Sequence, residues 1–302
     1  MAPGVVQIDT RLGGWGQVTA GYLLDGPAPV LVETGSRSSL PILLAALDGL
    51  GVGAADLAAV VVTHIHLDHA GGVGDVAAAF PAATVHVHER GAGHLADPAR
   101  LVASAARVYG DLLDTLYGRL VPTDRGRIRV LGDGDEVAIG PGRVLTALDT
   151  PGHARHHLAF HDSASGLMFS GDAAGVRLPD LGLLWPATPP PEFDLEAAVG
   201  SLRHMAGRRP AAVALAHFGV VPGDPADLLG EAEAALRRWA EVAEAAWHRG
   251  DDPAAALTAA FGDDLAGADD SQRRRMDALN GIHSNAAGLR RWLDTRSAAP
   301  PA

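Results

Sequence analysis

The stretch that decides the fold reads Thr63-His64-Ile65-His66-Leu67-Asp68-His69-Ala70-Gly71-Gly72. Four of its side chains can bind a metal ion, and these four fall within six positions. The apolar run Val60-Val61-Val62 before it indicates a buried strand, and the glycine pair after it indicates a turn. Imidazole and carboxylate are ligands that zinc uses at catalytic sites, and four of them on one strand-end loop could hold two cations. The stretch therefore predicts a metal-dependent hydrolase.

The composition predicts a large folded domain without disulfide bonds. The 302 residues are 47% hydrophobic, which is enough to bury a sizeable core. The chain contains no cysteine, so any metal must be held by histidine and carboxylate side chains. The formal net charge of −12 argues against a protein that binds nucleic acid by neutralising phosphates. Neither a secretory signal nor an apolar run that could span a bilayer is visible, so we expect a cytoplasmic protein with no membrane partner.

Strand and helix signals alternate over the first two thirds of the chain, which predicts an α/β architecture. Strand signals are followed by helix signals up to residue 88, and strands return between about 126 and 171. Between them, about 90–121 is expected to form a helical insertion. We expect a catalytic domain over 1–222.

Beyond residue 222 the sequence predicts only helices. They are expected at about 226–248, 253–262 and 270–294, and the last carries an apolar stripe. We interpret the stripe as packing of a helical extension, 223–296, on the catalytic domain; a homodimer face is the alternative. A short tail, 297–302, completes the chain.

Three further potential ligands each follow the end of a predicted strand. His153 follows the strand ending at Leu148, Asp172 follows the one ending at Phe169, and His217 follows the one ending at Leu215. Sites in layered α/β proteins commonly lie at such strand ends. The sequence therefore predicts that these three side chains join the His64 to His69 cluster in one site.

This ordered set of seven residues resembles the metallo-β-lactamase superfamily. The resemblance covers about 16–220 and implies an αββα sandwich of two similar halves, here with the helical insertion and the helical C-terminal extension. It implies two zinc ions, with iron or manganese as alternative metals. By the resemblance, the first ion is bound by His64, His66 and His153, the second by Asp68, His69 and His217, and Asp172 bridges them.

The chemistry implied by the resemblance is hydrolysis of an ester, thioester or lactone carbonyl in a small molecule. Two cations can share a hydroxide that attacks the carbonyl, and Asp68 can orient that hydroxide. The bridging Asp172 resembles the glyoxalase II and lactonase branches, since true β-lactamases lack a carboxylate there. Acyl-homoserine-lactone lactonases carry a tyrosine shortly after that position, where this chain has Ala173-Ala174-Gly175. The substrate is therefore left open.

Five residues are candidates for contacts with the substrate. Arg155 and Arg177 lie close in sequence to ligands and could hold a substrate carboxylate, with surface solvation as the alternative. Tyr109 and Trp185, together with Tyr117, could wall the pocket, with core packing as the alternative.

Two other enzyme classes fit the same ligands. A phosphodiesterase would use both metal positions. An iron-dependent oxidoreductase similar to the sulfur dioxygenases of this superfamily would use only the first set. The full second set of ligands favours the hydrolase.

Overall fold

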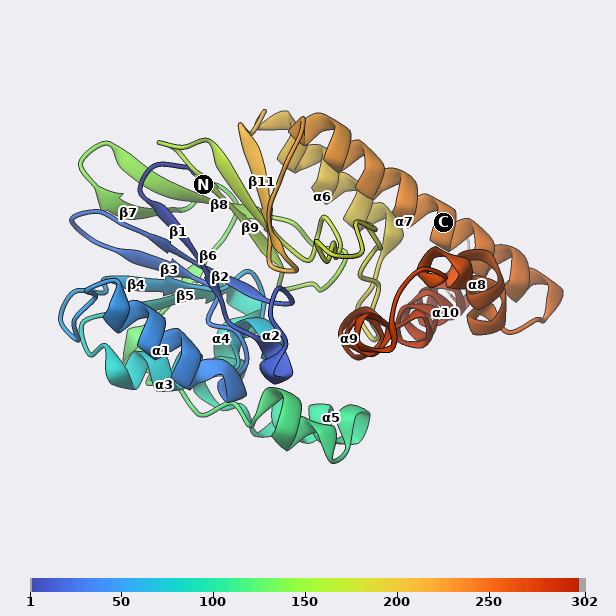
Figure 1. The fold of residues 1–302 in the computed structure, drawn as a ribbon, viewed down its shortest axis with the longest axis horizontal. Coiled ribbons are helices and arrows are strands. Elements are labelled where there is room, and N and C mark those ends of the chain that lie inside the picture. Colours follow the sequence, from blue (N-terminus) through green and yellow to red (C-terminus); the bar gives the residue numbers. More distant parts are fainter. Residues whose placement is uncertain (1, 299–302) are drawn as a thin grey trace.

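The computed structural model describes residues 2–298 and folds them around two six-stranded sheets that pack face to face (Figure 1). The first sheet has the order β1-β2-β3-β4-β5-β6, antiparallel up to β3 and parallel from β3 to β6. Its strands are β1 (Val5–Asp9), β2 (Ala20–Leu24), β3 (Val30–Val32), β4 (Ala59–Val61), β5 (Thr84–His88) and β6 (Ile128–Leu131).

The second sheet has the order β12-β11-β10-β9-β8-β7, and only β10 and β11 are parallel. Its strands are β7 (Glu136–Gly140), β8 (Arg143–Asp149), β9 (Leu158–Asp162), β10 (Leu167–Gly171), β11 (Ala212–Leu215) and β12 (Gly219–Val221). The helices are α1 (Leu40–Gly49), α2 (Leu67–Ala70), α3 (Val73–Ala79), α4 (Glu89–Ala96), α5 (Ala99–Tyr109), α6 (Leu195–Gly207), α7 (Pro225–Arg249), α8 (Pro253–Phe261), α9 (Asp270–Asn280) and α10 (Ile282–Ala298).

Alternation of side chains along each strand creates three apolar layers. Val61 points between the sheets, where it belongs to the same buried cluster as Phe160 and Phe169 of the second sheet. Its neighbours Val60 and Val62 point outward and pack with the helices of the first sheet. A third cluster joins the outer face of the second sheet to α6, α7 and the C-terminal helices. The predicted αββα sandwich is thereby confirmed.

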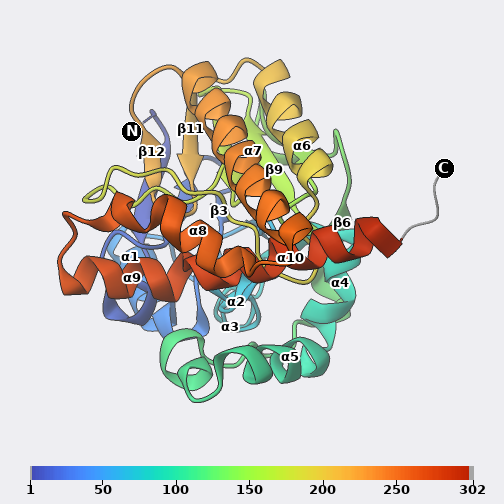
Figure 2. The same cartoon turned by 90° about the vertical axis from the view of Figure 1, so that its right-hand side faces the viewer.

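The predicted helical insertion consists of α4, α5 and a π-helical turn (Leu113–Tyr117). It lies between β5 and β6, which pair in parallel, so the chain returns to the first sheet after it. In Figure 2, α9 and α10 cross in front of α2, and α5 lies below them. The insertion and the C-terminal helices therefore flank the end of the sandwich where α2 begins.

The C-terminal extension is helical, but the prediction of one helix over 270–294 is wrong. Gly281 adopts an extended backbone with φ −60° and ψ 150°, so α9 ends at Asn280 and α10 begins at Ile282. The apolar stripe packs within the chain, since Met276, Leu289 and Leu293 are buried in the cluster of the second sheet. The homodimer alternative gains no support from it.

The domain division at residue 222 stays a prediction. Of the expected tail, residues 297 and 298 belong to α10, and 299–302 lie outside the described residues. None of the helices within residues 2–298 has the length and apolar character needed to cross a membrane.

Candidate metal centre

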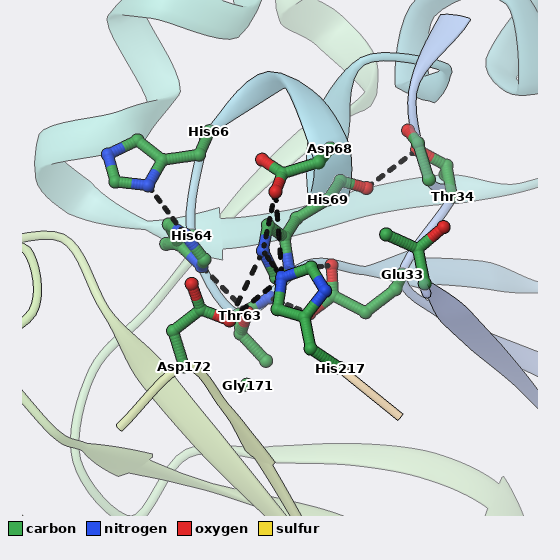
Figure 3. Close-up of polar contacts among 12 residues, drawn as sticks. Glu33, Thr34, Thr63, His64, His66, Asp68, His69, Gly171, Asp172 and His217 are labelled. Carbon is green, nitrogen blue, oxygen red and sulfur yellow. Dashed lines mark hydrogen bonds and ion pairs between the residues drawn. The ribbon is translucent and has the colours of Figure 1, made fainter. Parts of the chain in front are cut away.

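The seven predicted ligands lie together at one end of the two sheets. Figure 3 shows all of them except His153 with labels. The loop after β4 and the start of α2 present His64, His66, Asp68 and His69. From the opposite side, Asp172 follows β10 and His217 follows β11, while His153 comes from the loop between β8 and β9. The site thus forms where strand ends of both sheets meet.

The first group of potential ligands contains His64, His66 and His153, whose ligand atoms lie within 4.8 Å of one another. Nδ1 of His66 is 2.9 Å from Nε2 of His64 and 3.0 Å from Nε2 of His153. A second group contains Asp68, His69 and His217, again within 4.8 Å, with the two Nε2 atoms 3.1 Å apart. These are the two sets that the resemblance implies, and their assignment to two cations stays a prediction.

Asp172 lies between the two groups. Its Oδ1 is 3.3 Å from Nε2 of both His69 and His217, and its Oδ2 is 3.4 Å from Nε2 of His153. Oδ1 is buried and has no hydrogen-bond partner among the described residues. A buried carboxylate oxygen without a partner, surrounded by converging imidazole nitrogens, fits a divalent cation at this position.

In His153 and His217, the hydrogen bond of Nδ1 shows which imidazole nitrogen is free to bind a cation. Nδ1 of His153 lies 3.0 Å from the carbonyl oxygen of Ala187, and Nδ1 of His217 lies 2.8 Å from that of Val18. A carbonyl can only accept, so each Nδ1 carries the proton and donates it. In the neutral imidazole, Nε2 is then the unprotonated nitrogen and faces the site, as in metal-binding histidines whose other nitrogen is hydrogen-bonded.

Burial keeps the first group of histidines neutral. Burial and the neighbouring imidazoles lower the pKa of His64 and of His66 well below the usual value, and burial lowers the pKa of His153. Neutral imidazole is the form that binds metal ions. The first group therefore needs no loss of protons before it can bind a cation near neutral pH.

The second group carries more negative charge. Burial lowers the pKa of His69 and of His217, but the carboxylates of Asp172 and Asp68 outweigh burial and raise both pKa values. Burial would raise the pKa of Asp172, yet the adjacent imidazoles hold it well below the usual range. A cation entering the second group would therefore release protons from these histidines.

Glu33 is a buried carboxylate beside the second group that the sequence did not reveal. It follows β3, is 2% exposed, and its Oε2 lies 3.5 Å from Nδ1 of His69. Its Oε1 accepts a hydrogen bond from the Thr63 amide at 3.0 Å. Its φ of 64° lies in the left-handed region, which is uncommon for a residue with a side chain and is often found at functional sites. An acidic residue directly after the buried strand Val30–Val32 was the signal available.

Gly171 and His157 hold the backbone of Asp172 in place. The Asp172 amide donates to Nε2 of His157 at 3.2 Å, and Nδ1 of His157 contacts the Thr150 hydroxyl at 2.8 Å. Gly171 has a φ of 51°, and a Cβ there would lie 2.5 Å from Nε2 of His157. Glycine is therefore required for the approach of β10 to His157.

A cavity of about 210 Å³ opens onto the centre, and Asp68, Asp172 and three of the histidines line it. The insertion contributes Tyr109 and Tyr117, whose ring centroids are 4.5 Å apart. The C-terminal extension contributes Asn280 and Ser284, which sequence reasoning did not find. Burial raises the pKa of Tyr109 to about 12, so its hydroxyl is a hydrogen-bond donor at neutral pH.

The other candidate substrate contacts do not line this cavity. Arg155 is exposed, and its backbone amide donates to Glu192. The Arg177 guanidinium lies 3.7 Å from the Glu231 carboxylate on α7. Trp185 is buried behind the centre, where its Nε1 donates to Asp264 and its ring packs on Trp239. An ion pair therefore holds the Arg177 side chain, and core packing the Trp185 side chain, outside the cavity, whereas Arg155 lies on the exposed surface.

The fold and the converging histidine and carboxylate side chains define an α/β protein with a metal-binding site at the end of two facing sheets. The model of the metallo-beta-lactamase superfamily matches residues 13–217, and the chain belongs to this superfamily. Membership and the grouped ligands together indicate that the protein binds divalent metal.

Similar proteins support this placement. The metallo-beta-lactamase fold-containing protein of Sulfurisphaera tokodaii is 30% identical over 165 residues, which are 54% of this chain and 60% of that protein. A hydroxyacylglutathione hydrolase of Synechococcus is 31% identical over 181 residues, 60% of this chain and 56% of that enzyme. The matched part thus spans less than two thirds of either relative.

Among solved structures, the crystal structure of an archaeal metallo-beta-lactamase superfamily protein from Sulfolobus tokodaii has a TM-score of 0.71. The match covers 95% of this chain and 98% of that chain at 23% identity. At this identity, the likeness establishes the fold alone.

Proposed function

We propose that the protein is a hydrolase that holds two zinc ions and cleaves the carbonyl of an ester, thioester or lactone. The observation that carries the proposal is the position of Asp172, whose carboxylate lies within 3.4 Å of His153 in the first group and of His69 and His217 in the second. A carboxylate shared in this way supports two neighbouring cations rather than one.

The chain supplies the groups that would bind the ions and orient the reactants. When bound, two zinc ions would supply an activated water at neutral pH and a Lewis acid for the carbonyl oxygen. The Asp68 side chain is 15% exposed and lines the cavity, so it can accept a hydrogen bond from a water that enters there. Tyr109 and Tyr117 of the insertion line the same cavity with their side chains hydrogen-bonded to each other, so the pair can donate its remaining hydroxyl proton to an oxygen atom of a substrate.

The cavity supports a small, uncharged acyl substrate. None of the described residues that line it is an arginine or a lysine, and its side chains beyond the ligands are apolar or neutral. Its volume of about 210 Å³ is below the roughly 300–1,000 Å³ of pockets for drug-sized ligands. A glutathione thioester carries two carboxylates that would meet no basic side chain here. An ester or lactone with a short apolar chain suits the cavity better than the substrate in the name of the Synechococcus relative.

The test is a hydrolysis assay on metal-analysed protein with paired substrates that differ in charge. We expect turnover of p-nitrophenyl butyrate to exceed that of the anionic p-nitrophenyl hemisuccinate, and γ-lactones to be opened. Hydrolysis of bis-p-nitrophenyl phosphate in preference to the esters would instead favour the phosphodiesterase. About one iron per chain together with oxygen uptake would overturn the hydrolase in favour of the oxidoreductase.

The matched variants are Asp172→Asn and His248→Ala. Asp172→Asn keeps the size of the side chain but removes the charge between the two groups. We expect kcat/KM to fall by more than about a hundredfold, since even outer partners of metal ligands contribute 10–100-fold. His248 lies on the exposed surface of α7, so its replacement should leave activity unchanged. Full activity of a folded Asp172→Asn protein would contradict the proposal.

A further inference from the structure

The segment Pro186–Thr188 connects the metal centre to the C-terminal helices. Its central residue, Ala187, accepts the hydrogen bond from Nδ1 of His153 at 3.0 Å. This bond holds the His153 ring in the tautomer that presents Nε2 to the first group. Whatever fixes the Ala187 carbonyl therefore also fixes His153.

Two buried asparagines hold the residues on either side of Ala187. Nδ2 of Asn280, at the end of α9, donates to the Pro186 carbonyl at 3.0 Å. Oδ1 of Asn285, on α10, accepts from the amide and the hydroxyl of Thr188 at 2.6 and 2.8 Å. The two asparagines are joined by a bond of 2.9 Å from Nδ2 of Asn285 to Oδ1 of Asn280.

This polar network is buried and closely packed. Thr188 is 0%, Asn285 1% and Asn280 6% exposed, so water does not replace a lost hydrogen bond without rearrangement. Gly288, one turn after Asn285 in α10, lies against the same segment. A Cβ at Gly288 would overlap with the carbonyl oxygen of Thr188 and with the backbone of Pro189. The helix therefore contacts the segment directly through its backbone.

We propose that Asn280 and Asn285 are positioning residues of the metal centre, which they act on through Pro186–Thr188 and His153. They lie outside residues 13–217, the part that matches the superfamily model, so the C-terminal extension completes the centre in this chain. The inference rests on the first group of ligands in the proposed function and is independent of the substrate.

The test measures cobalt(II) affinity of the full-length, chelator-stripped protein by competition with a fluorescent chelator. Each group is isolated by a background substitution: His217→Ala leaves the first group, and His153→Ala leaves the second. In the His217→Ala background, Asn285→Ala should weaken cobalt binding by about 10–100-fold, as expected for an outer partner of a metal-binding histidine. In the His153→Ala background, the same change should leave cobalt affinity unaltered.

A second pair of variants covers the case in which Asn285→Ala fails to fold. In the His217→Ala background, Thr188→Ala removes the hydroxyl that bonds to Asn285 and should weaken cobalt binding, whereas Thr188→Ser should restore it. The matched control is Asp294→Ala, which removes a bond between α10 and Trp247 of α7 and should leave cobalt affinity unchanged.

Two results would overturn the inference. One is a folded Asn285→Ala protein with unaltered affinity in the His217→Ala background. The other is an equal loss in both backgrounds, which would indicate general destabilisation. Failure of the second group to bind cobalt would count against the two-zinc proposal alone, because the measurement in the His217→Ala background does not need that group.

Discussion

Glu33→Gln tests whether the second group depends on a carboxylate that contacts no cation itself. Gln has the same shape, but one of its two terminal atoms is an amide nitrogen that only donates. Oε1 faces the amide of Thr63 and Oε2 faces Nδ1 of His69 at 3.5 Å. If the amide oxygen keeps the bond to Thr63, the NH₂ group faces His69 and disfavours a proton on Nδ1.

The consequence is a change of tautomer in His69. With the proton moved to Nε2, the nitrogen that faces Asp172 and His217 can no longer bind a cation. We expect the affinity of the second group to fall by about 10–100-fold, equivalent to about 1.4–2.7 kcal/mol. Glu33 contacts no histidine ring of the first group, so the first group should keep its affinity for zinc.

The assay is zinc competition with a chelator in the His153→Ala and His217→Ala backgrounds. The loss should appear in the former, which retains the second group, and be absent in the latter. Glu89→Gln, on the exposed start of α4, is the control. An unaltered zinc affinity of the second group in a folded Glu33→Gln protein would refute the reasoning.

Three further predictions concern stability, the approach of β10 and the cavity wall. Burial would raise the pKa of Asp162, but bonds from Arg143 and its own turn lower it. Its stabilisation is therefore present above the unfolded pKa of about 4 and is lost as the pH falls through the lower folded value. Urea unfolding should show that Asp162→Ala loses about 3 kcal/mol at pH 7, and less at pH 2; equal losses would contradict this. Gly171→Ala should lower kcat/KM by about a hundredfold through displacement of Asp172, whereas Gly200→Ala, in open space on α6, should not; an active Gly171→Ala enzyme would count against it. Tyr117→Phe should raise KM for a neutral ester by up to about tenfold with unchanged metal content, and a loss of metal would instead indicate a structural role.

The clustering of the seven candidate ligands could be predicted because these residues sit in short segments with strong local signals. The β-branched apolar run Val60-Val61-Val62 predicts a buried strand, and it places His64 just past a strand end. The same holds for Asp172 after β10 and His217 after β11. Strand ends of a layered sandwich lie close together. The position of each candidate ligand at the end of its strand therefore predicted that these residues are neighbours in space.

The outer partners could not be predicted, because they depend on contacts between distant segments. Asn285 contacts Thr188 across 97 positions, and Glu33 contacts Thr63 across 30. Arg177 is near His217 in space, yet Glu231 on α7 draws its guanidinium away from the cavity. The helical spacing of apolar residues over 270–294 likewise did not reveal the break at Gly281. A single glycine ends α9 without changing which residues form the apolar stripe.

The most direct measurement is a zinc titration of chelator-stripped protein in which the rate of hydrolysis of an uncharged ester is followed against bound zinc. We expect negligible turnover without metal and a full rate only at two zinc ions per chain. In the Asp172→Asn variant, no amount of added zinc should restore that rate. A full rate in metal-free protein, or a rate that saturates at one zinc ion per chain, would contradict hydrolysis by a two-zinc centre.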